Sequence, residues 1–232
     1  MVARHFDLTR AGTQDMTKVL EAGGYTYAYE PAEGGDPRTL ILLHGTGGDH
    51  TSFIGLGRLV AKGAALIALK GDVVERGNLR FFRRVGERVY DMDDLALRTH
   101  RLADAIPELI SAHGRDPAAA IGLGYSSGAD LLGNLICETP DRLAGAVLMH
   151  PIMPFEPPST RALSGKPVLV TCGERDPVTG PAQVEAIAER LRTLGASVTA
   201  RGADSGHEVR EGELAAIRDW LAAFRTTTDA AA

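Results

Sequence analysis

The sequence predicts an α/β protein, in which helices cover both faces of a doubly wound, mostly parallel sheet to form a three-layer α/β/α sandwich. The first observation is a set of short, nearly continuous apolar runs, bounded by glycine, proline and polar residues as the buried strands of parallel sheets are. These runs lie at residues 39–45, 64–71, 118–124, 143–150 and 166–173. The second observation is that segments of helical period lie between the runs. Strands that alternate with helices need right-handed crossovers, which place helices on both sheet faces.

Weaker patterns complete the sheet and begin the set of helices. Two further strands are predicted near residues 25–31 and 197–203. The first helix is predicted over residues 93–113, where apolar side chains recur on one face, and Gly114 is a suitable stop. We expect Pro107 to kink or restart this helix, because proline cannot donate the backbone hydrogen bond that the helix needs there.

The remaining helices show the same apolar spacing. One is predicted over residues 129–138, and another over 184–194, ending at Gly195 with Thr179 as the candidate N-cap. The last is predicted near residues 217–224.

Length and composition favour one domain over residues 1–232. With 44% hydrophobic residues, the 232-residue chain can bury one sizeable core. Residues 1–20 match no element that we can assign, and residues 226–232 are predicted to be a disordered tail. The connection between the runs that end near 150 and begin near 166 is too short for a helical cap domain, so we expect no large cap.

Charge and hydropathy limit the partners. The 25 basic and 30 acidic residues are mixed and leave no basic face, so nucleic acid is not an expected partner. No signal-peptide core and no run of about 18 apolar residues is present, which predicts no membrane span and a cytoplasmic location. Cys137 and Cys172 lie in apolar runs and are interpreted as small buried hydrophobes in a reducing compartment. A monomer and a homodimer are both compatible with the sequence.

The pentapeptide Gly124-Tyr125-Ser126-Ser127-Gly128 has the form Gly-x-Ser-x-Gly. By itself this pattern is weak evidence, because a glycine-rich turn without chemistry can have the same form. Here an apolar run precedes it and an amphipathic segment follows it, which is the strand–turn–helix context that a nucleophile elbow requires. We therefore predict that Ser126 is a nucleophile.

A serine nucleophile needs a base, and the base needs a third group that orients it. Asp176 follows the run 166–173 in a turn with Pro177, and His207 follows the last predicted strand. The carboxyl ends of parallel strands can bring these three residues together. Alternatives remain for each: Asp176 as a plain turn residue, His207 as a loop histidine, and Glu174 as the rival acid.

The other histidines have no comparable placement. His150 ends an apolar run and could border the site, whereas the rest look like loop or helix-surface residues (His5, His50, His100 and His113). No pair shows metal-ligand spacing within an acidic cluster, so we expect neither a metal nor a cofactor.

Acyl transfer also needs donors for the negative charge that develops on the substrate oxygen. After the run 39–45, the glycines in Thr46-Gly47-Gly48 allow the backbone to curl so that the amide of Thr46 faces the pocket. The amide of Ser127, next to the nucleophile, is the second candidate donor. A phosphate-binding loop is the alternative for this segment, but the Lys-Ser/Thr ending of such loops is missing.

Taken together, these motifs resemble the α/β-hydrolase family of Ser-His-Asp enzymes. The phospholipase/carboxylesterase branch, which includes acyl-protein thioesterase-like enzymes and small bacterial carboxylesterases, is similar in four motifs. They are His44-Gly45-x-Gly47-Gly48-Asp49, the Ser126 elbow, Gly173-x-x-Asp176-Pro177 and Gly206-His207. Residues 76–95 are similar to a segment of the bacterial subgroup associated with hydroquinone and catechol resistance. One departure is Val-Thr-Gly180 after Pro177, where the thioesterase-like enzymes usually carry a proline.

The segment 76–95 combines aromatic and basic side chains. Phe81 and Phe82 could form apolar walls and Arg80, Arg83 and Arg84 could supply positive charge, so one hypothesis is a pocket for an aromatic or acidic acyl group. The alternative is a solvated basic loop whose phenylalanines pack into the core. The candidate pocket residues are Phe81, Phe82, Arg83, His150 and Val178.

The resemblance and the residues together predict an enzyme that hydrolyses small carboxylic esters through an acyl-enzyme on Ser126. The same triad could serve a thioesterase, a dienelactone-type lactonase or a lysophospholipase. The remaining alternative is a non-catalytic hydrolase scaffold that binds a ligand.

Overall fold

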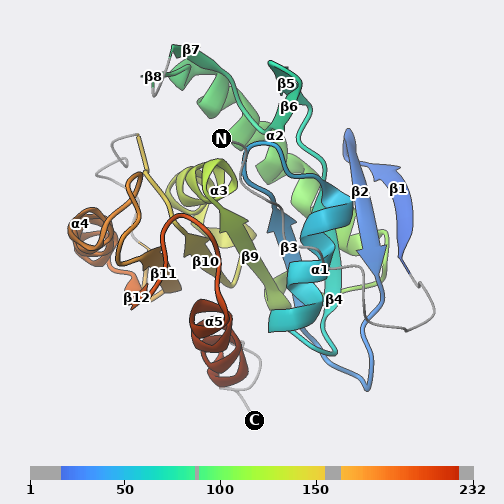
Figure 1. Ribbon diagram of the computed structural model, residues 1–232. Coiled ribbons are helices and arrows are strands. Elements are labelled where there is room, and N and C mark those ends of the chain that lie inside the picture. The colour runs from blue at the N-terminus through green and yellow to red at the C-terminus, as the bar shows by residue number, and fades with distance from the viewer. Residues whose placement is uncertain (1–16, 87–88, 155–162, 225–232) are drawn as a thin grey trace.

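The computed structural model describes residues 17–86, 89–154 and 163–224 (Figure 1). Residues 1–16 and the predicted tail 226–232 lie outside these residues, whereas residues 18–20 of the unassigned segment 1–20 belong to strand β1 (Lys18–Ala22). In the part of the chain that is described, no helix is both long and apolar enough to cross a membrane.

A mixed sheet of eight strands forms the middle layer of the described residues, in the order β1-β2-β4-β3-β9-β10-β11-β12. Strands β3, β4, β9, β10, β11 and β12 run parallel, whereas β1 and β2 pair antiparallel at one edge. The prediction of a mostly parallel sheet is confirmed. The bounds are β1 Lys18–Ala22, β2 Tyr25–Glu30, β3 Thr39–Leu43, β4 Ala65–Leu69, β9 Ala120–Tyr125, β10 Gly145–Met149, β11 Pro167–Gly173 and β12 Ser197–Ala203.

The register brings several strand ends to one level. Gly124 of β9 pairs with Leu43 of β3 on one side and with Leu148 of β10 on the other. Leu148 in turn pairs with Val170 of β11. The loops that follow these parallel strands therefore leave the sheet at the same edge, where sites of α/β proteins form.

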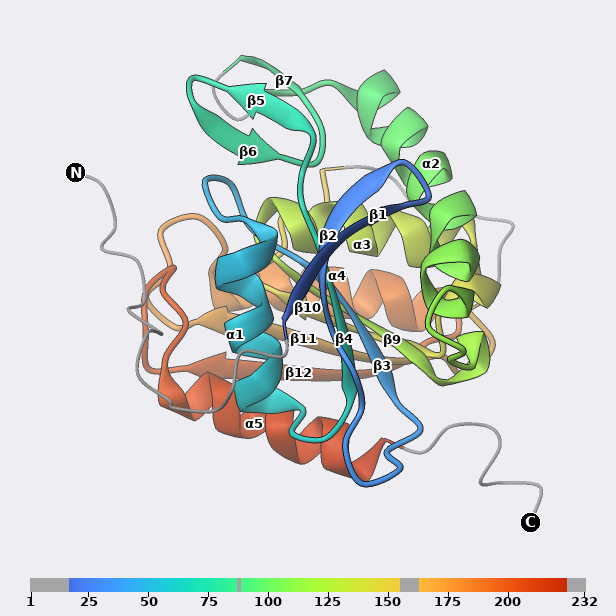
Figure 2. The same cartoon turned by 90° about the vertical axis from the view of Figure 1, so that its right-hand side faces the viewer.

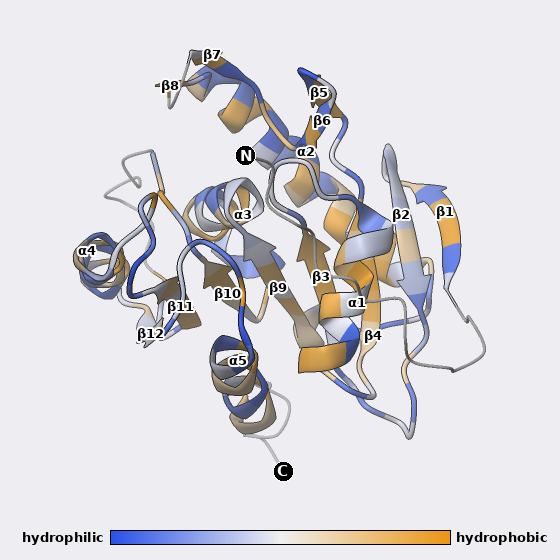
Figure 3. Cartoon of the chain, viewed as in Figure 1, coloured by the Kyte–Doolittle hydropathy of each residue, from blue (hydrophilic) through white to orange (hydrophobic). Residues whose placement is uncertain are grey.

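Helices cover both faces of the sheet (Figures 1 and 2). Helices α1 (His50–Val60) and α5 (Glu211–Ala223) pack on one face, where Ile54 and Ile217 belong to the same buried cluster. Helices α2 (Met92–Ser111), α3 (Ser127–Glu138) and α4 (Pro181–Thr193) pack on the other. Because both faces of β3 and β4 are covered, these strands are buried at every position, and all their residues except Thr39 are apolar (Figure 3). Short 3₁₀ helices at Pro117–Ala119 and Pro140–Arg142 precede β9 and β10.

Helices α2 to α5 lie where the apolar spacing predicts them, with two differences in detail. Helix α2 continues through Pro107 to Ser111 and does not restart there. Helix α4 begins after Gly180, so Thr179 is not its N-cap. The hydroxyl of Thr179 is directed instead to the carbonyl oxygen of His150, at 3.4 Å.

Helix α1 was not predicted, and its two glycines explain why. Gly55 and Gly57 lower the intrinsic helix propensity of the segment. Gly57 is needed for close packing on the sheet, because a Cβ there would come within 2.7 Å of Leu42 Cδ1. The sequence signal that marks this helix is the capping box in which Asp49 accepts from the amide of Ser52.

Two short hairpins between β4 and α2 form an excursion at the carboxyl edge of the sheet (Figure 1). Strand β5 (Val73–Glu75) pairs with β6 (Asn78–Arg80), and β7 (Arg84–Gly86) pairs with β8 (Val89–Tyr90). The amide of Gly47 donates to the carbonyl oxygen of Leu79 at 3.0 Å, which ties the first hairpin to the loop after β3. Between β10 and β11, the described residues contain no helix, in agreement with the predicted lack of a large cap.

Candidate active site

Ser126 lies on a sharp turn between β9 and α3. Its backbone has φ 52° and ψ −119°, a conformation that L-residues rarely adopt. The turn is held because the amide of Ser126 donates to the carbonyl oxygen of Met149, and its own carbonyl accepts from Asp130. Strain of this kind is found at functional sites, where the surrounding structure maintains it.

The two glycines of the pentapeptide are required by close backbone contacts. A Cβ on Gly124 would lie 2.6 Å from the carbonyl oxygen of Gly128, and one on Gly128 would lie 2.3 Å from that of Leu43. Because these neighbours are backbone atoms, they cannot move aside cheaply. The sequence folds into this turn only with glycine at both positions.

Ser126, His207 and Asp176 form a hydrogen-bonded chain. Oγ of Ser126 lies 3.1 Å from Nε2 of His207, and Nδ1 of His207 lies 2.8 Å from Oδ2 of Asp176. The carboxylate can only accept, so Nδ1 of His207 carries the proton and Nε2 can accept the hydroxyl proton of Ser126. The side chain of Asp176 is buried, whereas that of His207 is 30% exposed and can be reached from solvent.

Neighbouring backbone positions hold the two loops that carry Asp176 and His207. The amide of Arg175 donates to the carbonyl oxygen of Ser205, which joins one loop to the other. Gly173 permits this approach, since a Cβ there would lie 1.9 Å from the carbonyl oxygen of Gly206. The hydroxyl of Tyr125, at the end of β9, donates to the carbonyl oxygen of His207 at 2.5 Å and holds the loop that carries His207.

Asp176 is held as a carboxylate despite its burial. Burial alone would raise the pKa of Asp176, but hydrogen bonds from His150, His207 and the backbone amides of Val178 and Thr179 outweigh it and lower the pKa. Its negative charge can therefore stabilise a proton on His207.

The loop after β3 and the start of α3 lie against each other beside Ser126. Ser127 is the first residue of α3, so its amide has no acceptor within the helix. The amides of Gly47 and Gly48 bond to Leu79 and Gly45, whereas no hydrogen bond of the Thr46 amide is found among the described residues. Oγ1 of Thr46 lies 3.2 Å from Oγ of Ser127. Within the described residues, the amides of Thr46 and Ser127 are therefore available as hydrogen-bond donors on the two elements beside Ser126.

His44 anchors this loop from inside the protein. Its Nε2 accepts from the amide of Gly71 at 2.9 Å, so Nδ1 carries the proton and donates to the carbonyl oxygen of Gly45 at 2.7 Å. Burial lowers the pKa of His44 and keeps the ring neutral. In the sequence, His44 is part of the motif at the end of the first apolar run, but the pattern alone assigns it no role.

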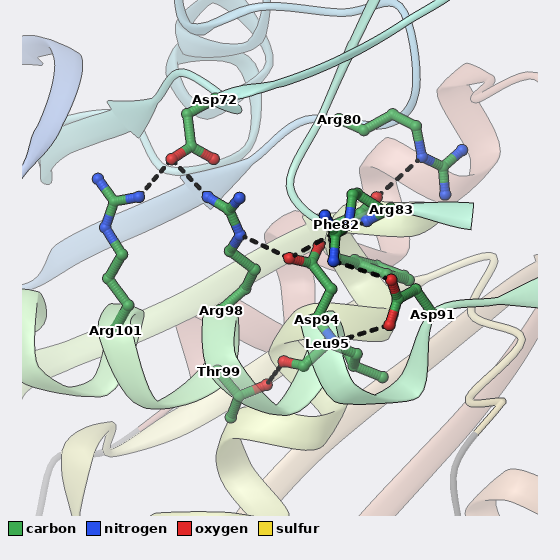
Figure 4. A network of polar contacts seen from close by, with 10 residues as sticks. All are labelled: Asp72, Arg80, Phe82, Arg83, Asp91, Asp94, Leu95, Arg98, Thr99 and Arg101. Atoms are coloured by element: carbon green, nitrogen blue, oxygen red, sulfur yellow. Dashed lines mark hydrogen bonds and ion pairs between the residues drawn. The ribbon is translucent and has the colours of Figure 1, made fainter. Parts of the chain in front are cut away.

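Arg80, at the end of β6, also reaches this loop. The side chain is 3% exposed, and its Nη1 donates to Oγ1 of Thr46 at 2.6 Å. Its Nε donates to the carbonyl oxygen of Phe82 at 3.2 Å (Figure 4). The first hairpin of the excursion therefore places a buried cation against the side chain of Thr46, whose amide is a candidate oxyanion donor.

Two further arginines of the excursion, Arg83 and Arg84, are paired with carboxylates. Arg83, whose side chain is 61% exposed, bonds to Asp91 and Asp94 (Figure 4). Arg84 bonds to Glu75 at 2.7 Å. On the neighbouring turns of α2, Arg98 and Arg101 both bind Asp72 (Figure 4). These pairs build a surface network that fixes the excursion on α2.

The structure corrects the placement of several candidate pocket residues. Phe81 and Phe82 are 1% and 0% exposed and belong to the core, so they do not form the walls of an open pocket. Arg83 points to the surface network. His150 is 0% exposed and lies behind Asp176, out of reach of a substrate. Val178 is partly buried beside the acid, and its amide donates to Oδ1 of Asp176 at 2.7 Å.

The rival site residues do not take part. Glu174 is exposed and Asp176 is the carboxylate bonded to His207. His50 is buried at the start of α1, and His113 is stacked on Tyr29. His100 is exposed, and His5 lies outside the described residues. One atom each of His150, Asp176 and His207 lie within 4.8 Å of one another, close enough for a metal ion. The hydrogen bonds among them account for this grouping without one.

Comparisons with known proteins identify the family of this chain. A family model described as TAP-like protein matches residues 149–230. The putative hydrolase MhqD of Bacillus subtilis (strain 168) is 36% identical over 188 residues, which cover 81% of this chain and 94% of that protein. This chain belongs to the α/β-hydrolase superfamily. The predicted resemblance is confirmed.

Solved structures of similar proteins superpose on most of the chain. A carboxylesterase from Mesorhizobium loti is 30% identical with a TM-score of 0.83, covering 90% of this chain and 99% of that one. The Bacillus cereus carboxylesterase is 31% identical with a TM-score of 0.81, covering 86% and 95%. The protein Atu2452 of unknown function from Agrobacterium tumefaciens str. C58 is 41% identical with a TM-score of 0.77, covering 87% and 97%.

Proposed function

We propose that this chain is a serine esterase that hydrolyses small carboxylic esters through an acyl-enzyme on Ser126. The observation that carries the proposal is the chain of contacts Ser126 Oγ to His207 Nε2 at 3.1 Å and His207 Nδ1 to Asp176 Oδ2 at 2.8 Å. Ser126 also lies on a strained turn between β9 and α3, which is the position that a nucleophile elbow requires.

In the proposed acylation step, Oγ of Ser126 attacks the carbonyl carbon of the ester while Nε2 of His207 takes the hydroxyl proton. Asp176 keeps the proton of His207 on Nδ1 and stabilises the imidazolium that forms. His207 then gives its Nε2 proton to the leaving alkoxide as the carbon–oxygen bond breaks. An alcohol leaves and the acyl group stays on Ser126.

The amides of Thr46 and Ser127 are the proposed donors to the oxyanion of the tetrahedral intermediate. Ser127 is at the N-terminus of α3, where the helix dipole also favours negative charge. Donors of this kind contribute on the order of 3 kcal/mol each to lowering the barrier.

In the deacylation step, His207 takes a proton from water, and the resulting hydroxide attacks the acyl carbonyl carbon. The bond to Ser126 Oγ breaks and the proton returns from His207 to that oxygen. A carboxylic acid is released and the resting site is restored. None of these steps calls for a cofactor.

The first test is Ser126→Ala, with Ser111→Ala as the matched control because Ser111 is exposed at the end of α2. Hydrolysis of p-nitrophenyl acetate and butyrate should drop to near background in Ser126→Ala and stay unchanged in the control. A fluorophosphonate probe should add its mass to the peptide that holds Ser126. Full activity in Ser126→Ala would refute the assignment, and a failure to label would favour a non-catalytic scaffold.

Oxygen esters are the proposed substrate class because the similar enzymes from Mesorhizobium loti and Bacillus cereus are named carboxylesterases. Matched oxygen esters, thioesters and lactones of the same acyl chain should be compared by kcat/KM. The highest value for the oxygen ester would support the proposal. A preference for the thioester or the lactone would assign the same triad to the alternative reaction.

The cytoplasmic location expected from the sequence also stays a prediction, as does the choice between monomer and homodimer. Two buried free cysteines, Cys137 and Cys172, are consistent with a reducing compartment. Fractionation of the native cells and size-exclusion chromatography with light scattering would test the two points.

A further inference from the structure

A second histidine lies behind the triad acid. His150 follows β10, and its Nδ1 lies 2.6 Å from Oδ2 of Asp176, the same oxygen that His207 contacts. Its Nε2 lies 3.1 Å from Oε2 of Glu213, on α5. The other oxygen of Glu213 accepts from the hydroxyl of Thr171 at 2.6 Å. The side chains of His150, Asp176 and Glu213 are at most 1% exposed.

The proton count of this buried cluster follows from the contacts. Both ring nitrogens of His150 face carboxylate oxygens, and each contact needs one hydrogen. Either His150 is an imidazolium between two carboxylates, or it is neutral and Glu213 holds the second proton. In both arrangements Nδ1 of His150 donates to Asp176. The three side chains carry a total charge of −1 in either case.

The backbone at His150 is also unusual. Its φ of 50° lies in the left-handed region, which a residue with a side chain enters at a cost. The amide of His150 donates to the carbonyl oxygen of Thr171 at 2.8 Å, which keeps the turn in place at the end of β10. The strained turn directs the imidazole toward Asp176 and away from solvent.

We infer that His150 is a positioning residue of the esterase site, which holds the carboxylate of Asp176 and draws negative charge from it, with Glu213 as its partner. The inference rests on the proposed function, because it assigns these residues to the same triad. A triad acid that accepts from two histidines has its orientation fixed from both sides. It is also a weaker base than one that accepts from His207 alone.

The charged and titratable groups that surround His150 support this role. Burial alone would lower the pKa of His150, but the hydrogen bonds and charges of Glu213 and Asp176 outweigh it and raise the pKa. The ring of Tyr125 is 5.6 Å away, and burial raises its pKa so that it stays neutral. Burial raises the pKa of the Cys172 thiol on β11 to about 11, so it is neutral as well. The ring of His207 lies 5.1 Å from that of His150.

A graded set of variants tests the inference. His150→Leu removes the donor to Asp176, whereas His150→Asn keeps an N–H group near the position of Nδ1. Glu213→Gln keeps a partner for His150 and for Thr171 but removes the carboxylate. His113→Asn is the control, because His113 stacks on Tyr29 at the other end of the sheet. Circular dichroism and thermal melts of every variant would show that the fold is retained.

We expect the acidic limb of the pH profile of kcat/KM to move to higher pH in His150→Leu, by on the order of one pH unit, because the full charge of Asp176 then acts on His207. Glu213→Gln should move it less in the same direction, and His113→Asn should leave it unchanged. We also expect kcat to fall by about 10- to 100-fold in His150→Leu and to be partly restored in His150→Asn. An unshifted acid limb in His150→Leu would overturn the inference and leave His150 as a packing residue.

A measurement that needs no activity separates this inference from the proposed function. The titration of the His207 ring can be followed by proton NMR in the wild type and in His150→Leu. If Ser126→Ala retains activity, the esterase assignment fails, and the NMR midpoint still reports whether His150 acts on the Asp176–His207 pair. Equal midpoints in the two proteins would reject the inference, whatever the substrate is.

Discussion

Nη1 of Arg80 lies 2.6 Å from Oγ1 of Thr46. That hydroxyl lies 3.2 Å from Oγ of Ser127, so the side chains of the two proposed oxyanion donors are joined and anchored on a buried cation. Arg80 can only donate, which leaves the hydroxyl of Thr46 free to donate to Ser127. The loop after β3 is thus held by two contacts: Arg80 of the excursion between β4 and α2 bonds to Thr46, and His44 bonds to Gly71 inside the protein.

Removing the side chain of Arg80 should therefore lower kcat much more than it weakens substrate binding. In Arg80→Met we expect kcat for p-nitrophenyl acetate to fall by on the order of 10- to 100-fold with little change in KM, because a loosened Thr46 amide acts mainly in the transition state. Arg76→Met, at an exposed position of the same hairpin, is the matched control. Loss of activity through KM alone would contradict this role.

Arg83 and Arg84 should not select anionic substrates. Arg83 is paired with Asp91 and Asp94 and Arg84 with Glu75, so their charges are already compensated at the surface. We expect Arg83→Gln and Arg84→Gln to change kcat/KM for a neutral ester and for an ester with a free carboxylate by the same factor, less than about threefold. A selective loss for the anionic ester in either variant would restore the hypothesis of an anion pocket.

Residues 76–95 carry a clear compositional signal but no signal for the direction of each side chain. The basic and aromatic composition is visible in the sequence. Which arginine is buried and which ones pair with surface carboxylates depends on the two hairpins. Along β6 the chain passes from exposed Asn78 to buried Arg80. The next two residues, Phe81 and Phe82, are buried, and Arg83 then reaches solvent. Because a hairpin of three-residue strands has almost no periodic signal, the sequence pattern could not assign these directions.

The main strands and the three residues of the candidate triad were predictable for a different reason. Buried parallel strands are apolar along their length, and the loops at their carboxyl ends converge. The Gly-x-Ser-x-Gly motif and the positions of Asp176 and His207 after predicted strands were therefore enough to propose the triad. His150 follows β10 at the same edge, which was recognised. Its burial was not, because it depends on a left-handed turn and on Glu213, which lies on a helix far along the chain.

Gly173 should be as necessary for activity as the glycines of the elbow. In Gly173→Ala, the new Cβ would overlap the carbonyl oxygen of Gly206 and push the loop with His207 away from Ser126. We expect a fall in kcat of at least about 100-fold at moderate loss of stability. Gly212→Ala, for which no atom lies within 4 Å of the added Cβ, is the control and should retain activity. Normal kinetics in Gly173→Ala would show that the two loops adjust to the added methyl group.

His44 should make the fold less stable in acid. Burial lowers the pKa of His44 below the unfolded value of about 6.5, although the Gly45 carbonyl and the charge of Asp49 oppose the shift in part. The unfolded chain therefore binds a proton that the folded chain does not, and the free energy of unfolding falls as the pH drops below about 6.5 and is fully regained above it.

Replacing His44 by glutamine removes this titration while an amide oxygen can still accept from Gly71. We expect the difference in unfolding free energy between about pH 8 and pH 5.5 to shrink by on the order of 1 kcal/mol in His44→Gln, measured by urea denaturation. His100→Gln, exposed on α2, should leave that difference as it is in the wild type. If the pH dependence of His44→Gln matches that of the wild type, the acid sensitivity arises from other groups and the tether between His44 and Gly71 is not its source.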